Sequence, residues 1–268
     1  MGLRNAIKQS CDIYFYETAR RLGVDRLSIT AKKFGLGEKA FEIFDEEKKG
    51  LVPDTKWKLK NIGKGWVLGE TLITGIGQGY FQSTPFQLCL MTAQLANGGY
   101  KIEPRIIDDR YAVQPIIEEW RERFYKKNNN LNTLDSKKLY RNPENIKFVL
   151  DALYGANNEP MGTSYGSRHL KSEYVYAGKT GTSQIRKITA EERELKLKQN
   201  ELPYERRDHA LFVGFAPYKN PRYAISVVIE HGGTGSSGAA PIAKKVIKKV
   251  LDRHKLRKKY QLDLFQEV

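Results

Sequence analysis

Residues 176–184 read YAGKTGTSQ and place an amine, two hydroxyls and a glycine on one extended stretch. Lys179 supplies a positive charge, and Thr180 and Thr182 supply hydroxyl groups that can bind a carboxylate. Gly181 has no side chain, so a substrate can approach the backbone closely there. This pattern is typical of one wall of an acyl-transfer site.

The same stretch has two other interpretations, a phosphate-binding loop and a purely structural strand. A phosphate-binding loop needs a glycine five positions before Gly178, where Glu173 stands, so the spacing excludes it. A strand rich in Gly and Thr that only turns, without any chemistry, is the structural alternative.

An acyl-transfer site needs a nucleophile, and the search for one in this chain fails. No serine is followed three residues later by lysine. Thr30 and Thr55 do have such a lysine, but Thr30 lies within a predicted helix and Thr55 lies in a loop beside Trp57. We therefore expect the nucleophile to lie outside these 268 residues.

The histidines and cysteines do not predict a metal site or a cofactor. The four histidines lack metal-ligand spacing, and the two cysteines, Cys11 and Cys89, form no CxxC pair. His209 and His231 raise the possibility of a Ser–His pair, but both flank strand-like runs, which favours packing at the edge of a sheet.

The apolar patterning predicts an α+β fold with an antiparallel sheet covered by helices. Thr84, Pro85 and Gln87 form a capping box that begins a helix ending near Ala96. Asp25 is expected to cap another helix, and residues 36–73 are expected to be loop-rich. Further helices are predicted at 3–9, 13–22, 25–34, 143–155 and 239–254, and strands at 100–107, 174–184, 210–217 and 222–232.

The chain carries 46 Lys and Arg against 31 Asp and Glu, a net charge of +15. Near its C-terminus the lysines share a helix with an apolar face, made by Ile242, Val246, Ile247, Val250 and Leu251. We therefore expect these lysines to form the solvated side of a packed helix. This disfavours nucleic acid as a partner and leaves attraction to an anionic surface as the alternative. No run of about 18 apolar residues predicts a membrane span.

Three elements together are more specific than any one of them. These are Ser10-Cys11-Asp12, the GIGQGY segment followed by Thr84-Pro85, and Lys179-Thr180-Gly181-Thr182. In this order they resemble the transpeptidase domain of penicillin-binding proteins, which use S-x-x-K, S-x-N and K-T-G elements around an active serine. Aspartate in the second element, followed by IYFY, resembles the class B, cell-elongation branch, penicillin-binding protein 2.

The resemblance implies a role for each matching residue. Ser10 would relay a proton, with a helix cap as the alternative, and Asp12 would bind the active-site lysine or a substrate amide, unless it too is a cap. Lys179 would bring positive charge, and the Thr182 N–H would be one donor of the oxyanion hole. The substrate-binding residues would be Thr180, Gly181, Thr182 and Ser183.

The resemblance also implies what the chain belongs to. Residues 1–254 would form part of a transpeptidase domain whose N-terminal strands and nucleophile helix lie elsewhere, and 255–268 a basic and polar tail. The complete enzyme would cross-link peptidoglycan stem peptides ending in D-Ala-D-Ala and bind β-lactams. It would work at the periplasmic face of the cytoplasmic membrane, with membrane proteins of the elongation machinery as partners and an anchor outside this chain.

Two rival interpretations remain from the sequence. The first is a serine β-lactamase or penicillin-sensing domain, which the Ser-Cys-Asp-IYFY and GIGQGY elements disfavour. The second is a non-catalytic chain that acts only by binding partners of the elongation machinery.

Overall fold

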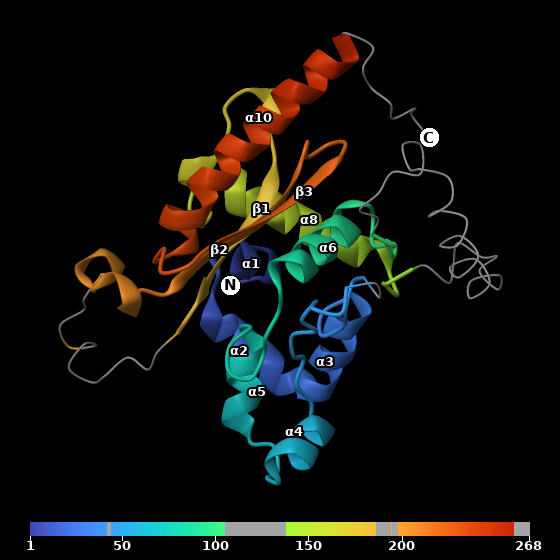
Figure 1. Ribbon diagram of the computed structural model, residues 1–268, viewed down its shortest axis with the longest axis vertical. Coiled ribbons are helices and arrows are strands. Elements are labelled where there is room, and N and C mark those ends of the chain that lie inside the picture. The colour runs from blue at the N-terminus through green and yellow to red at the C-terminus, as the bar shows by residue number, and fades with distance from the viewer. Residues whose placement is uncertain (42–43, 105–137, 186–193, 195–197, 260–268) are drawn as a thin grey trace.

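The computed structural model describes residues 1–41, 44–104, 138–185, 194 and 198–259 (Figure 1). Its helices are α1 (Leu3–Gln9), α2 (Asp12–Leu22), α3 (Val24–Lys33), α4 (Thr55–Ile62), α5 (Leu68–Gly75), α6 (Pro85–Ala96), α8 (Pro143–Asn158) and α10 (Ala240–Lys259). Its strands are β1 (Ala177–Ser183), β2 (His209–Ala216) and β3 (Tyr223–Ile229). A short turn of π-helix, Gly235–Ala239, leads into α10.

The strands form one antiparallel sheet in the order β1-β2-β3. Helix α10 packs against one face of the sheet, while α6 and α8 pack against the other (Figure 1). Lys179 lies opposite Val213, and Phe212 lies opposite Val227. The predicted α+β class, with three neighbouring antiparallel strands covered by helices, is confirmed.

Alternate side chains of β2 fill the cores on the two faces of the sheet. Phe212 is fully buried in a cluster with Tyr176 and the small residues at the start of α10. Phe215 points to the opposite face, where it packs with Leu153 of α8. This alternation follows from the two-residue period of a strand, and it fixes which face of the sheet each helix covers.

Of the two capping signals predicted, the structure bears out the one at Thr84 and not the one at Asp25. Thr84 and Gln87 form the predicted reciprocal capping box at α6. Asp25 does not cap α3, because the N-cap position is held by Gly23, which has no side chain to bond the helix. The Asp25 carboxylate instead accepts hydrogen bonds from the backbone and hydroxyl of Thr55, which ties α3 to the start of α4.

Residues 36–73 are loop-rich, as predicted, but they also contain α4 and most of α5, which the sequence did not indicate. Lys58 of α4 is almost fully buried and pairs with Glu70 of α5, with Nζ–Oε distances of 2.6 and 2.7 Å. Tyr80 packs its ring against Trp57 and Trp66 beside this ion pair. These long-range contacts stabilise two eight-residue helices that are too short to form by propensity alone.

Two other predicted elements differ from the structure. A strand over 100–107 is not formed within the described part, 100–104, where Tyr100 makes only an isolated bridge to Lys138. Residues 105–107 lie outside the described residues. The last helix runs to Lys259, five residues beyond the predicted end. Among the described helices, none is both long and apolar enough to span a bilayer.

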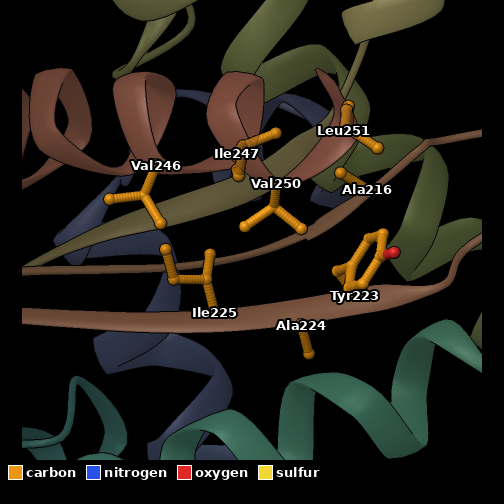
Figure 2. A pocket seen from close by; sticks show the side chains of 8 residues that line it. All are labelled: Ala216, Tyr223, Ala224, Ile225, Val246, Ile247, Val250 and Leu251. Atoms are coloured by element: carbon orange, nitrogen blue, oxygen red, sulfur yellow. The ribbon is translucent and has the colours of Figure 1, made fainter. Parts of the chain in front are cut away.

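The apolar face predicted for α10 is only partly buried. Ala243, Ile247 and Leu251 form the buried stripe, whereas Ile242 and Val246 are 39% and 41% exposed. Figure 2 shows that an apolar groove runs between α10 and β3, lined by Ala216, Tyr223, Ala224, Ile225, Val246, Ile247, Val250 and Leu251. The groove therefore lies beside the outer strand of the sheet.

Among the described residues, β3 pairs on one side only. The Ala216 carbonyl accepts a hydrogen bond from the Arg222 N–H. The backbone N–H and C=O groups of the even-numbered residues of β2 therefore point toward β3. By the antiparallel pattern, Val227 bonds to its partner Phe212, while the N–H and C=O of Val228 point outward. An apolar edge of this kind recruits other chains.

We expect the isolated 268-residue chain to self-associate through the outer edge of β3. Val228→Pro removes an outward N–H without touching the bonds to β2, so it should reduce the oligomer fraction and keep the fold. Val227→Pro is the matched control, because it removes an N–H of the β2–β3 ladder and should unfold the sheet. Gel filtration and thermal melts measure both. A monomeric wild-type chain with one cooperative melt would contradict this expectation.

Candidate active site

Ser10 lies at the break between α1 and α2, where the chain turns sharply. Its backbone is left-handed, with φ 52° and ψ 57°, although it is not glycine. Such a conformation costs roughly 1–2 kcal/mol for a residue with a Cβ, so the surrounding structure must hold it in place. Ser10 is the C-cap of α1 through its backbone N–H, which donates to the carbonyls of Ala6 and Ile7, while its Oγ contacts the Lys179 amine of β1.

Lys179 is the centre of the site. Its Nζ donates to Ser10 Oγ and, at 2.9 Å, to the carbonyl of Thr180. Burial lowers the pKa of Lys179 from its usual value to about 8, and the nearby carboxylate of Asp12 opposes that shift. The Lys179 amine is therefore protonated in most molecules at pH 7 and becomes neutral in mild alkali.

Asp12 is the first residue of α2 and is exposed. Cys11 holds the cap position of α2 and makes no side-chain bond to the helix, so Asp12 is not the cap. A carboxylate in the first turn is favourable for the helix dipole. The Asp12 carboxylate acts on Lys179 through its charge. That Asp12 also contacts a substrate directly stays a prediction.

Thr180 gains a partner that the sequence did not reveal. Its Oγ1 lies 2.9 Å from Thr163 Oγ1, and the N–H of Thr163 donates to the Lys8 carbonyl. Thr163 stands in the loop after α8, which the sequence showed only as rich in Gly, Ser and Asn. Nothing in that loop marked this threonine, since only the fold brings it to β1.

The two glycines of β1 differ in what requires them. A Cβ on Gly178 would lie 2.3 Å from the Phe212 ring, so packing demands glycine there. A Cβ on Gly181 would meet only Leu211, at 3.4 Å, which is an ordinary contact. Glycine at 181 is therefore not demanded by the described protein atoms, in keeping with the expectation that a ligand approaches there.

Thr182 and Ser183 end the strand. Thr182 is the exposed member of the pair and its carbonyl accepts a hydrogen bond of 2.8 Å from Gln78 Nε2. Ser183 is half-buried and lies opposite His209. The sequence marked the GIGQGY segment as a whole but gave no reason to choose Gln78 within it.

His209 and His231 do not contact Ser10. The His231 N–H donates to His209 Nδ1 at 2.9 Å, and His231 Nδ1 lies 3.1 Å from the Arg207 carbonyl. The two rings thus pack against one another at the end of the sheet, as their flanking positions favoured. In the described part of the chain, no group of three side chains could hold a metal ion.

The Lys179 amine on β1, the Ser10 hydroxyl at the helix break and the Thr180 hydroxyl thus lie together, as their motifs implied. Residues 1–248 match the family described as "Penicillin binding protein transpeptidase domain", and the chain belongs to that family. Within this family, the relatives of the chain identify it as a transpeptidase domain of the penicillin-binding protein 2 type.

The comparisons are consistent across sequence and structure. The chain is 32% identical, over 94% of its length, to the peptidoglycan D,D-transpeptidase MrdA of Salmonella typhimurium, and 33% identical over 91% to that of Haemophilus influenzae. It spans 38% and 35% of those two proteins.

Two solved structures superpose well on the chain. Pseudomonas aeruginosa PBP2, in complex with WCK 5153, gives a TM-score of 0.72 with 37% identity over 93% of this chain and 49% of that one. A complex between PBP2 and MreC from Helicobacter pylori gives 0.73 with 28% identity, covering 99% and 41%.

We expect Lys179→Met to stabilise the protein near neutral pH while removing the site's charge. The folded-state pKa of about 8 lies below the value of 10.5 for the free side chain, so the folded protein binds the proton less tightly than the unfolded chain. Wild-type stability should therefore rise between pH 8 and 10.5 relative to Lys179→Met. Chemical denaturation at several pH values measures this, and parallel pH curves would rule out a depressed pKa.

Proposed function

We propose that this chain carries the proton-relay and carboxylate-binding half of a serine D,D-transpeptidase acting on peptidoglycan stem peptides. The observation that carries the proposal is the contact between Lys179 Nζ and Ser10 Oγ, beside Thr180 and Thr182 on the edge of β1 that pairs with no other described strand. We propose peptides ending in D-Ala-D-Ala as the substrate class and β-lactams as inhibitors, which membership of the family supports.

The direction of the Lys179 hydrogen bond explains how Ser10 could relay a proton. An ammonium group only donates, so it occupies a lone pair of Ser10 Oγ and leaves the serine's own proton available. That proton can pass to a departing amine while Ser10 takes another from the nucleophile's side. Lys179 stays charged and stabilises the negative charge that develops nearby.

The reaction we propose has two steps. The attacking serine forms a bond to the carbonyl carbon of the penultimate D-Ala, and the bond to the terminal D-Ala breaks as its nitrogen receives a proton through Ser10. An amine from a neighbouring stem peptide then displaces the serine and completes the cross-link. The serine must come from a segment with the S-x-x-K pattern, which these 268 residues do not contain.

Carboxylate binding falls to the hydroxyls and the amine of β1. Thr180 shares its hydroxyl with Thr163, which orients it, and Thr182 is exposed at the strand's end. The terminal carboxylate of the peptide, or of a penicillin, would lie against these hydroxyls and the positive charge of Lys179. The Thr182 N–H would be one donor for the developing oxyanion.

We also propose where the complete protein works and with what. Since the relatives are bacterial peptidoglycan transpeptidases, we place it at the periplasmic face of the cytoplasmic membrane. A structural neighbour is a PBP2 in complex with MreC, so an elongation protein of that kind is the partner we propose. Pull-down of the complete protein with such a partner tests the assignment.

We expect the 268-residue chain to form no covalent adduct with a fluorescent penicillin on a denaturing gel, because it lacks the nucleophile. The complete protein, meaning this chain with any in-frame coding sequence upstream of Met1, should be labelled. Ser10→Ala in the complete protein should slow labelling by roughly 10²–10⁴-fold, the usual contribution of a positioned acid or base. A boil-resistant band from the short chain would reveal a different nucleophile.

We expect Asp12→Asn to move the alkaline limit of acylation to lower pH. The Asp12 carboxylate raises the pKa of Lys179, so its loss should bring that pKa below about 8 without changing the melting temperature much. Acylation rates of the complete protein between pH 6 and 10 measure the shift. Asp25→Asn serves as the charge-matched control, since Asp25 bonds to Thr55 and is not among the groups that shift Lys179. An unmoved profile would leave Asp12 with a role in the helix alone.

A further inference from the structure

Gln78 connects the segment after α5 with the end of β1. Its Nε2 donates to the Thr182 carbonyl at 2.8 Å, between residues 104 positions apart. Thr182 is the most exposed residue of β1, and the chain leaves the sheet one residue later. Strand ends of this kind fray unless something ties them down.

The geometry of the sheet shows which groups this bond controls. Because the Thr182 carbonyl bonds to Gln78 and not to β2, it faces away from the sheet, and in an antiparallel pair the N–H of the same residue faces the same way. Thr180 shares this orientation, and its carbonyl accepts from Lys179 Nζ. The outward carbonyls of Thr180 and Thr182 thus each accept from a side chain, which leaves the N–H groups of these two residues to a ligand.

The position of Gln78 is itself fixed by how α5 ends. Gly77 is left-handed, with φ +76°, and its N–H donates to the Thr74 carbonyl. The N–H of Gln78 donates to the Ile73 carbonyl at 3.1 Å. These two bonds form a Schellman motif, which places Gln78 at a defined position just past the helix.

The helix that carries this motif is anchored in turn. The ion pair between Lys58 and Glu70 joins α5 to α4, and α5 packs against α2, whose first residue is Asp12. Within the described part of the chain, the Gln78 side-chain amide links this support to the end of β1. Its acceptor is the carbonyl of the residue whose N–H faces the site.

We infer that Gln78 is a positioning residue: its side-chain amide pins the Thr182 carbonyl and so holds the Thr182 N–H in place to donate to the substrate's carbonyl oxygen. This inference rests on the proposed function. It adds a fourth segment, the turn after α5, to the groups that shape the site. It also gives the GIGQGY stretch a specific task, in which Gly77 provides the turn and Gln78 provides the donor.

The test compares Gln78→Glu and Gln78→Ala with the matched control Gln82→Glu in the complete protein. Gln82 is exposed, lies four residues away and makes no side-chain hydrogen bond among the described residues. Two quantities are measured: amide hydrogen exchange at Ser183, which lies opposite His209, and the acylation rate of a penicillin separately from its initial binding.

We expect both Gln78 variants to exchange at Ser183 about three- to tenfold faster, as the loss of one hydrogen bond allows. Their acylation rate should fall by roughly ten- to a hundredfold, less than for a removed oxyanion donor, with initial binding nearly unchanged. Gln82→Glu should behave as wild type in both.

The outcomes separate this inference from the proposed function. A wild-type protein that is not acylated refutes the proposed function, and Ser183 exchange then decides alone whether Gln78 ties the strand. Acylation by wild type with an unchanged rate in both Gln78 variants overturns the positioning role, whatever the exchange shows. Equal losses of initial binding and acylation rate overturn it too, since they indicate general damage to the site.

Discussion

The contact between Lys179 and Ser10 joins two parts of the molecule that are 169 residues apart. Lys179 comes from the edge of the sheet, and Ser10 comes from a seven-residue helix with a single fully buried residue, Ala6. A helix this short has no stability of its own. The site can therefore exist only if something else holds α1 at a fixed distance from β1.

Helix α8 supplies that connection through its charged C-terminal half. Arg4 donates to Asp151 at 2.5 Å and to Glu159 at 2.6 and 3.0 Å, and Lys8 donates to Glu159 at 2.8 Å. The two cations hold the pKa of Glu159 down at about 2, so the Glu159 carboxylate stays charged well below neutral pH. The opposite face of α8 packs on β1 through Leu153. Because the same helix leads into the loop of Thr163, it sets the positions of both Ser10 and Thr163.

The sequence predicted those parts of the fold that are encoded locally, and it missed those that depend on tertiary contacts. The strand containing Lys179 and the capping box at Thr84 are local patterns, and both are confirmed. Helix α5 reads LGETLITG, with glycine near each end, and it forms because Glu70 meets a buried lysine from α4. No local pattern predicts a partner twelve residues away, so the sequence does not predict this helix within the loop-rich segment.

The candidate site divides in the same way. Residues carried by a spaced motif, such as Ser10 and Lys179, are brought together as their motif implied. The sequence did not predict Thr163 or Gln78. Each acts through one side-chain hydrogen bond to β1 from a loop, and no motif marks either residue. Their partners are a hydroxyl and a backbone carbonyl of β1, whose positions depend on the whole sheet.

The site is built at some cost in stability, and the costs fall on the residues that do its chemistry. Ser10 holds a left-handed backbone, and Lys179 is buried far enough to lose proton affinity. Neither feature helps the protein to fold, so both must be held by contacts elsewhere. The charged network on α8 is partly exposed and screened, so its value lies more in fixing the direction of α1 than in free energy. Packing of α8 and α10 against the two faces of the sheet must then provide most of the stability that keeps the strained serine beside the lysine.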